Sequence, residues 1–182
     1  MNDVTFPTRQ FLRLVPTARR LATEDLSVLL SYLIPAQVPP GAVLFVNGEE
    51  PDAAYLIVTG EVRVVRDLPG GETVTLARLG RGDVVGDMGL IDGTPRTATA
   101  QVATELSALR LDVSAYRRLK ADAHPAADWL LQEIDRRLAL RIRTMFDRIS
   151  RVREEPGLAA AVPEIVDSER PWYARVWPLG AR

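Results

Sequence analysis

The stretch Gly82-Asp83-Val84-Val85-Gly86-Asp87-Met88-Gly89-Leu90-Ile91-Asp92-Gly93-Thr94-Pro95-Arg96-Thr97-Ala98-Thr99-Ala100 decides the fold. Its short apolar runs and turn residues predict a strand, a single helical turn, a tight turn and a second strand. Gly86 and Gly89 carry no side chain, so the backbone there can approach another group closely. A helical turn that begins at this point directs free N–H groups and the positive end of its dipole towards that group.

The polar side chains of this stretch indicate which group that is. Arg96, held in place by the preceding proline, offers a rigid fork of N–H donors that suits a phosphate. Thr97 adds a hydroxyl, whereas the carboxylate of Asp87 would repel a phosphate and accept a hydrogen bond from a sugar hydroxyl. The combination predicts a ribose-phosphate pocket. Two plainer interpretations remain open: Arg96 as a surface arginine at a turn, and Asp87 as an N-cap of the helical turn.

Short β-branched runs, separated by Gly, Asn, Asp and Pro, extend on both sides of this stretch, from Ala42 to Asp112. Six of them predict strands: Ala42–Val46, Tyr55–Val58, Val62–Val65, Thr73–Leu79, Thr97–Val102 and Leu106–Leu111. The region has no helical pattern long enough for a parallel crossover. We therefore expect a mainly β protein in which the strands form an antiparallel sandwich or roll.

Helical spacing of apolar residues marks both flanks of the β region. One helical zone is predicted from Thr8 to Leu33, with Thr23 as an N-cap and Pro35 at its end. After the strands, Val113 to Asp122 predicts a short helix, and Pro125 begins a long one that reaches about Arg153. Its apolar residues form a coiled-coil type seam: Leu131, Ile134, Leu138, Ile142, Met145, Ile149 and Val152. Such a seam can pack on the roll or pair with a twin helix in a homodimer.

Four segments follow from these patterns. They are an N-terminal helical segment (1–34), a β-roll (35–112) that contains the stretch 82–100, a pair of C-terminal helices (113–155) and a tail rich in Pro and Trp (156–182).

Composition excludes several classes of function. The chain has no cysteine and a single histidine, His124, so no disulfide framework, Cys-ligated zinc, Ser-His-Asp triad or His-rich metal site is expected. Neither a catalytic set nor a metal site emerges. The N-terminus does not resemble a signal peptide, and no stretch approaches the ~20 apolar residues that span a bilayer. We expect a cytoplasmic protein that is not bound to a membrane.

The stretch 82–100 resembles the phosphate-binding cassette of the cyclic nucleotide-binding domain family, which includes protein kinase A regulatory subunits and catabolite activator regulators. The family pattern is Phe-Gly-Glu, a short apolar helix, and Pro-Arg-Ala-Ala-Thr or Pro-Arg-Thr-Ala-Thr. The matching residues are Gly86, Leu90, Gly93, Pro95, Arg96, Ala98 and Thr99, with Gly41, Gly48, Tyr55, Ile57 and Gly60 upstream. The resemblance covers about residues 8–153. It implies an antiparallel jelly-roll type β-roll with N-terminal helices and a long C-terminal helix.

The resemblance also assigns roles to individual residues. Arg96 would hold the exocyclic phosphate oxygens, and Thr97 would contact the phosphate or the base. Backbone N–H groups of Gly86, Asp87, Met88 and Gly89, and those near Thr97 and Ala98, would complete the cradle. The C-terminal helix would bring Arg141 or Thr144 near the purine, and the tail residues Trp172, Tyr173 and Trp177 could stack on it or pack elsewhere.

Two positions depart from the family pattern. Val85 replaces the usual Phe, which we interpret as a change of packing. Asp87 replaces the Glu that holds the ribose 2′-hydroxyl, which withdraws the carboxylate by roughly 1.3 Å, enough to weaken a hydrogen bond of ~2.7 Å. Weakened binding is expected.

The expected function is that of a sensor for cAMP or cGMP, without enzyme activity and without a cofactor. It would signal by movement of its C-terminal helix, to an unknown effector protein or through a homodimer. Only 27 residues follow position 155, too few for the winged helix-turn-helix of the family's transcription regulators, so DNA binding is not expected. The alternative is a degenerate roll that acts as a ligand-free dimerisation or docking scaffold. A cupin-like enzyme is a third interpretation, which the scarcity of histidine contradicts.

Overall fold

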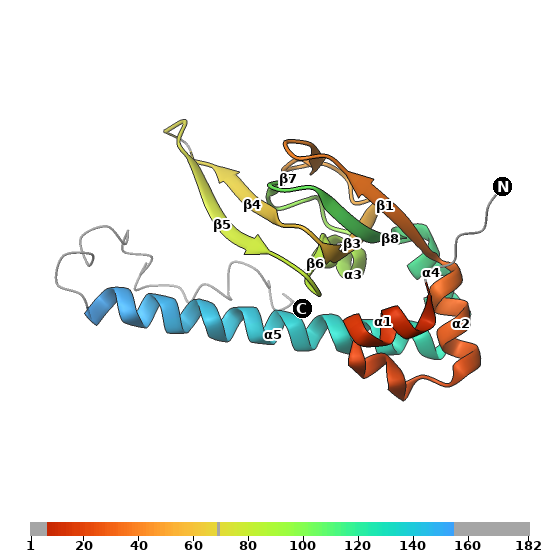
Figure 1. The fold of residues 1–182 in the computed structure, drawn as a ribbon. Helices are drawn as coiled ribbons and strands as arrows, with labels where there is room; N and C mark the ends of the chain where they lie inside the picture. Colours follow the sequence, from red (N-terminus) through yellow and green to blue (C-terminus); the bar gives the residue numbers. More distant parts are fainter. Residues whose placement is uncertain (1–6, 69, 155–182) are drawn as a thin grey trace, which may run out of the picture. The chain divides into compact units, whose positions relative to one another are not determined.

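The computed structural model describes residues 7–68 and 70–154 (Figure 1). The chain has two compact units, and the boundary between them in the sequence lies between Arg136 and Arg137. The first unit begins with the helices α1 (Thr8–Leu14), η1 (Pro16–Arg20, a 3-10 helix) and α2 (Thr23–Ser31). Its strands are β1 (Leu33–Val38), β2 (Val43–Phe45), β3 (Ala53–Thr59), β4 (Val62–Asp67), β5 (Thr73–Leu79), β6 (Val84–Val85), β7 (Thr99–Val102) and β8 (Leu106–Asp112). The helices α3 (Asp87–Asp92) and α4 (Val113–Ala121) belong to the same unit, and α5 (Pro125–Glu154) begins in it and continues into the second.

The strands form two four-stranded sheets, which confirms the predicted antiparallel β-roll. Their orders are β1-β8-β3-β6 and β2-β7-β4-β5, and each pairing recorded among these strands is antiparallel. The apolar core contains residues of both sheets, and Ile57, Val62 and Leu106 in it are fully buried. Burying a side chain of this size stabilises the fold by about 1.5–3 kcal/mol, so the core holds the frame on which the loops are placed.

Strand β1 was not predicted, because Pro35 was interpreted as the end of a helical zone. Helix α2 ends at Ser31, and β1 pairs with β8 from Leu33 opposite Leu111 to Val38 opposite Leu106. Since β1 is the edge strand of its sheet, a proline that lacks an N–H donor is tolerated there. Two residues of the predicted helical segment 1–34 therefore belong to the sheet.

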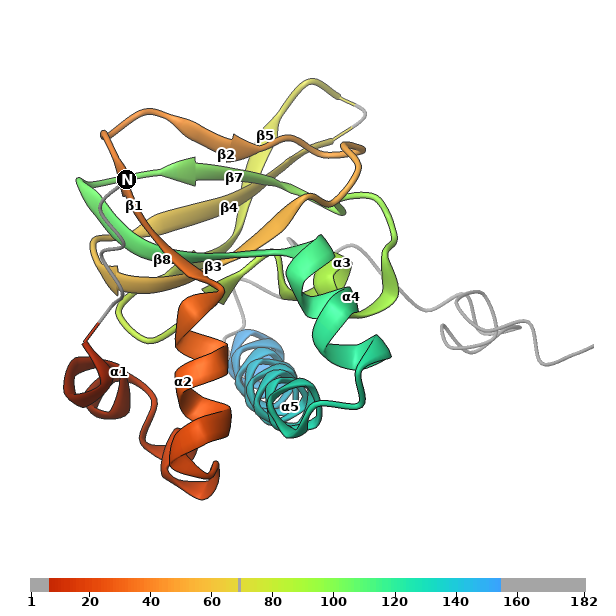
Figure 2. The same ribbon diagram turned by 90° about the vertical axis from the view of Figure 1, so that its right-hand side faces the viewer.

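The structure has helices on both sides of the β region, as predicted, and their bounds lie close to the predicted ones. Helices α4 and α5 begin at Val113 and Pro125 as predicted, whereas the N-terminal zone comprises two α-helices with a 3-10 turn between them. Thr23 is the first residue of α2 and Ala22 occupies the N-cap, so the predicted cap is wrong by one position. Figure 2 shows α1, α2 and α4 gathered at one end of the roll.

The first turns of α5 contact the N-terminal helices. The rings of Phe11 and Trp129 lie 6.5 Å apart, and the indole N–H of Trp129 donates to the carbonyl of Thr17 at 3.3 Å. The Thr17 hydroxyl donates to the buried carboxylate of Glu133 at 2.8 Å. These contacts tie residues more than a hundred positions apart in sequence.

Among the described side chains of the predicted α5 seam, burial decreases from Ile134 to Ile142. Ile134 is buried, Leu131 and Leu138 are half-buried, and Ile142 is 50% exposed; the side chains of the remaining seam residues lie outside the described residues. Within residues 7–68 and 70–154, no helix is both long and apolar enough to cross a membrane.

Candidate functional site

Helix α3 is a six-residue helix bounded by glycines in the left-handed conformation. Gly86 is its N-cap with φ of 82°, and Gly93 is its C-cap with φ of 68°, a backbone region that side chains disfavour. A β-carbon at Gly86 would lie 2.6 Å from Nη1 of Arg96. The group that the backbone approaches closely is therefore the guanidinium of Arg96 itself.

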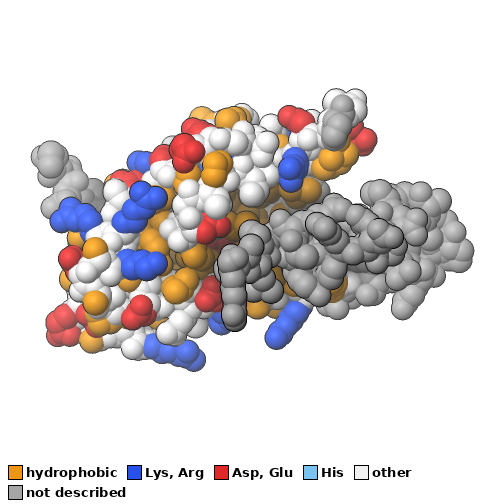
Figure 3. All heavy atoms as spheres, turned by 180° about the vertical axis from the view of Figure 1, so that it is seen from behind, with side chains coloured by type: hydrophobic (Ala, Val, Ile, Leu, Met, Phe, Trp, Pro, Cys, Tyr) orange, Lys and Arg blue, Asp and Glu red, His pale blue; other side chains and the backbone are white. Residues whose placement is uncertain are grey.

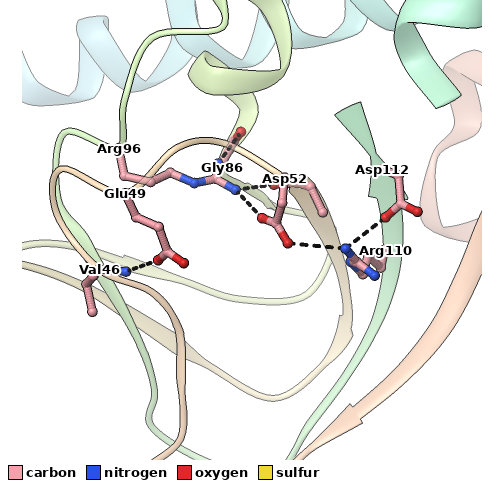
Figure 4. A network of polar contacts seen from close by, with 8 residues as sticks. Val46, Glu49, Asp52, Gly86, Arg96, Arg110 and Asp112 are labelled. Atoms are coloured by element: carbon pink, nitrogen blue, oxygen red, sulfur yellow. Dashed lines mark hydrogen bonds and ion pairs between the residues drawn. The ribbon is translucent and has the colours of Figure 1, made fainter. Parts of the chain in front are cut away.

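Arg96 is buried, with 5% of its surface exposed, so its interpretation as a surface arginine is wrong. Its Nη1 donates to the carbonyl of Gly86 at 3.1 Å, and Nη2 donates to the carbonyl of Ala53 at 2.5 Å and to Oδ1 of Asp52 at 3.1 Å (Figure 4). The guanidinium carbon lies 4.0 Å from the centre of the Phe45 ring, a cation–π contact. Its Nε is buried and has no hydrogen-bond partner among the described residues.

The loop between β2 and β3 fixes the backbone of Arg96. The N–H of Arg96 donates to the carbonyl of Glu49 at 2.8 Å, and the N–H of Gly48 donates to the carbonyl of Arg96 at 2.7 Å. The Glu49 carboxylate in turn accepts from the N–H of Val46 at 2.9 Å. Strand β7 begins at Thr99, two residues later than predicted.

Arg96 is the first member of a row of alternating charges, which we call the charge network: Arg96, Asp52, Arg110 and Asp112 (Figure 4). Nη2 of Arg110 lies 3.2 Å from Oδ2 of Asp52 and 3.0 Å from Oδ1 of Asp112. The side chain of Asp52 is 60% exposed, and its backbone carbonyl accepts from the N–H of Val113, the first residue of α4, at 2.8 Å. The network therefore connects the cassette with β8 and with the start of α4.

Sequence reasoning missed Asp52, Arg110, Asp112 and Phe45. The charged residues come from a loop and from one strand far along the chain, and no spacing rule brings them to Arg96. The pairing of β3 with β8 does so, because it places Tyr55 opposite Arg110. A pairing register was not available from a single sequence.

The carboxylate of Asp87 is buried at the start of α3, with 4% of the residue exposed. It accepts from the N–H of Met88 at 3.2 Å, but it does not cap the helix, because Gly86 is the N-cap. The N-cap interpretation of Asp87 is therefore wrong.

The other predicted residues of the cassette differ in exposure. Met88 and Thr97 are exposed, whereas Ala98 and Gly89 are buried. A β-carbon at Gly89 would lie 2.6 Å from the β-carbon of Pro51, so this glycine lets α3 pack on the loop that precedes β3. Val85, in place of the usual Phe, is buried in the core, as a change of packing requires.

The predicted base-contacting residues are not brought to the cassette within the first unit. Arg141 and Thr144 lie on α5 in the second unit, where Arg141 is half-buried and the side chain of Thr144 lies outside the described residues. Trp172, Tyr173 and Trp177 also lie outside the described residues. Of the predicted site residues, the described contacts therefore join Arg96 with Gly86 at the start of α3.

Burial beside the charge network changes the pKa of the Tyr55 phenol. Loss of hydration raises the pKa of its phenol above the ordinary value of 10.0, and the negative charge of Asp52 raises it further. The opposing effects of Arg110 and Arg96 are smaller. Tyr55 is therefore a neutral hydroxyl at physiological pH.

Comparisons with known proteins agree with this geometry. Residues 35–122 match the family described as cyclic nucleotide-binding domain. The cyclic AMP receptor protein of Thermus thermophilus is 40% identical over 132 residues, which cover 69% of this chain and 61% of that protein. The CRP-like cAMP-activated global transcriptional regulator of Mycobacterium tuberculosis is 34% identical over 113 residues, 62% of this chain and 50% of that protein.

A solved structure shows the same likeness over most of both chains. A cyclic nucleotide-binding domain from Methylobacillus flagellatus superimposes with a TM-score of 0.72 at 26% identity, and the match covers 87% of this chain and 88% of that one. This chain spans only half to three fifths of the length of the two curated relatives. The match of residues 35–122, the two antiparallel sheets and the glycine-bounded cassette lead to one assignment. Residues 35–122 of this chain belong to the cyclic nucleotide-binding domain family.

Proposed function

We propose that the β-roll binds a cyclic nucleotide, cAMP or cGMP, and acts as the sensor of a regulatory protein. The observation that carries this proposal is the buried guanidinium of Arg96, packed against Gly86 at the start of α3. A buried cation is stable only with anionic or strongly polar partners. At its solvent side Nη2 of Arg96 contacts the Asp52 carboxylate, and Nε has no hydrogen-bond partner among the described residues. The N–H groups on these two nitrogens are donors that suit a phosphate.

Binding would change the partners of Arg96. The carbonyls of Gly86 and Ala53 hold the guanidinium from the protein side, so a phosphate has to approach from the side of the exposed Asp52 carboxylate. It would compete with Asp52 for Nη2 and with the Asp87 carboxylate for the N–H of Met88, in the first turn of α3. Asp87 would accept from the ribose 2′-hydroxyl.

Signalling would follow from movement of α3 towards the phosphate, with the C-terminal helix changing its contacts in response. The names of the two curated relatives, a cyclic AMP receptor protein and a cAMP-activated regulator, support the ligand class. An effector protein and the expected location in the cytoplasm stay predictions. So does the expectation that this chain does not bind DNA.

Thermal unfolding with and without nucleotide tests the proposal. A ligand at about 100 times its dissociation constant stabilises a protein by ~2.7 kcal/mol, which should raise the melting temperature by roughly 5–10 °C. We expect this shift with cAMP or cGMP and not with the corresponding 5′-monophosphate as a matched control, since the monophosphate carries an additional charge and lacks the cyclised ester.

The variant that removes binding has to keep the fold. Because Arg96 also holds two backbone carbonyls, Arg96→Ala would lower the free energy of unfolding by about 2–4 kcal/mol without any ligand. Arg96→Lys keeps the positive charge but loses the fork, and should abolish the ligand-induced shift with a smaller loss of stability. No shift of the wild-type protein with either nucleotide at millimolar concentration would exclude the sensor.

A ligand-free scaffold is the second candidate. The contacts of Arg96 favour it, because Asp52 and two carbonyls already satisfy much of the guanidinium. In that case the second unit would supply the function by pairing with another copy, through the exposed apolar side chains of Leu140, Ile142 and Phe146. Dimers that form equally well with and without nucleotide, together with the absence of a thermal shift, would support this candidate.

A further inference from the structure

Asp52 poses an electrostatic problem for the proposed anion site. Its Oδ1 lies 3.1 Å from Nη2 of Arg96, so the carboxylate orients the guanidinium. The same negative charge lies where it would repel a phosphodiester that approaches Arg96. Because its side chain is 60% exposed, solvent weakens this repulsion but does not remove it.

Arg110 places a second positive charge beside the Asp52 carboxylate, at the oxygen that does not contact Arg96. It contacts the other oxygen of Asp52, with Nη2 3.2 Å from Oδ2, so one carboxylate bridges two guanidinium groups. Asp112 holds the same Nη2 at 3.0 Å and thereby keeps Arg110 beside Asp52. Arg110 is one third exposed and comes from β8, a strand outside the cassette, so its position does not depend on α3.

We propose that Arg110 is a positioning residue of the anion site: it neutralises Asp52, which lets Asp52 orient Arg96 without repelling the phosphate of a bound cyclic nucleotide. This inference rests on the proposed function and deepens it. Arg110 acts through Asp52, so its contribution should disappear when residue 52 carries no charge.

A double-mutant cycle measures this dependence. Affinity for the nucleotide that shifts the wild-type melting temperature is determined by calorimetry for the wild type, Arg110→Met, Asp52→Asn and the double variant. We expect Arg110→Met to weaken binding about two- to fivefold, the size expected of one partly exposed ion pair. In the Asp52→Asn background the same substitution should change affinity by less than about twofold, because the charge that Arg110 neutralises is gone.

Three further measurements separate positioning from a structural effect. Arg110→Lys should restore most of the affinity, because it restores the charge. The loss in Arg110→Met should shrink at about 1 M salt, which screens the repulsion. Arg78→Met, which removes an arginine paired with Glu61 at 2.6 Å in the other sheet, should bind like the wild type.

The outcomes distinguish this inference from the proposed function. Equal losses in both backgrounds, or unchanged affinity in Arg110→Met, would overturn the role of Arg110 while binding itself stands. If the wild type binds neither nucleotide, the proposed function and this inference both fail. If Arg110→Met does not fold, as judged by its unliganded melting curve, Arg110→Gln replaces it in the cycle with the same expected results.

Discussion

The guanidinium of Arg96 serves the fold as well as the proposed site. It joins the carbonyl of Ala53, at the start of β3, to the carbonyl of Gly86, at the start of α3. Phe45, from β2, covers one of its faces. A side chain that holds three elements together is already in place before a ligand arrives, and such pre-organisation lowers the entropy that binding has to overcome.

Asp87→Glu tests the assigned contact with the ribose. The added methylene extends the carboxylate by roughly 1.3 Å, to the length usual in the family, and should strengthen a hydrogen bond to the 2′-hydroxyl. We expect affinity for the cyclic nucleotide to rise about three- to tenfold, the value of improving one charge-assisted bond. Titration calorimetry measures this change.

The 2′-deoxy form of the nucleotide is the matched control for this prediction. It lacks the hydroxyl, so Asp87→Glu should leave its affinity unchanged. A gain for both ligands would show that residue 87 acts on the pocket in another way and does not contact the ribose.

At the scale of elements, local patterns were sufficient to predict most strands and helices. Strand β5 and the starts of α4 and α5 lie where β-branched alternation, Pro125 and helical spacing place them. Local rules predict that Pro35 ends a regular element, so they do not predict strand β1. Proline is accommodated there because β1 lies at the edge of its sheet.

In the candidate site, too, residues close in sequence could be predicted and contacts between distant residues could not. The cassette residues follow one another in sequence, so a motif was sufficient to place Gly86 and Gly89 at a close approach of the backbone, while their role towards a ligand stays a prediction. The partners of Arg96 could not be identified, because Asp52 and Arg110 meet it only through strand pairing and loop packing. The burial of Arg96 was missed for the same reason.

Gly89→Ala tests how closely α3 packs on the loop before β3. A β-carbon at Gly89 would lie 2.6 Å from that of Pro51, so α3 or the loop has to shift. We expect the free energy of unfolding to fall by about 1–3 kcal/mol, the usual cost of overpacking, as measured in urea. Affinity for the nucleotide should fall as well, because the amides of α3 move.

Gly80→Ala is the control for this variant. A β-carbon there meets no atom within 4 Å, and the residue does not adopt the left-handed conformation. It should match the wild type in stability and in affinity. A Gly89→Ala variant with the same behaviour as Gly80→Ala would show that α3 does not press on Pro51.

At the scale of the whole molecule, the described face drawn in Figure 3 carries positive and negative side chains alike. Figure 3 shows both signs, with hydrophobic side chains between them, on the face that it presents. The formal net charge is −1. A net charge this close to zero does not by itself attract an anion, so recognition of a small anion has to come from a built site such as the one proposed around Arg96.

Stability should fall at alkaline pH. Burial raises the pKa of Tyr55 and of Tyr116 above 10.0 in the folded protein, so the folded state keeps protons that the unfolded chain releases. The free energy of unfolding therefore falls as the pH rises from about 10 towards the pKa values of these phenols in the folded protein. Each tyrosine contributes a decrease of about 1.4 kcal/mol per pH unit. Urea unfolding between about pH 9 and 11.5 measures this slope.

The composition makes this titration easy to interpret. Lys120 is the only lysine among 23 basic residues, so few other groups ionise in this range. Tyr55→Phe should flatten the slope. An unchanged slope in Tyr55→Phe and in Tyr116→Phe would mean that neither phenol has a raised pKa.

Pairing of two chains is expected through the second unit. Ile142 and Phe146, which lie one turn apart on α5, each expose half or more of their surface, and a pair of exposed apolar side chains on one helix face favours association. Ile142→Glu should convert a dimer into a monomer, as measured by light scattering, without lowering the melting temperature by more than a few degrees. Arg66→Glu, a change at an exposed position of β4 in the first unit, is the control and should remain dimeric. A monomeric wild type would refute this expectation.

The carbonyl of Asp52 receives the first N–H of α4, while its carboxylate holds Arg96. A change in the contact between Asp52 and Arg96 could therefore reach the start of α4 through Asp52 alone, without passing through the apolar core. If the roll binds a nucleotide as proposed, substitutions in the apolar core should lower the melting temperature and leave the dissociation constant of the nucleotide unchanged. The affinity of the proposed site and the stability of the fold would then be separately adjustable.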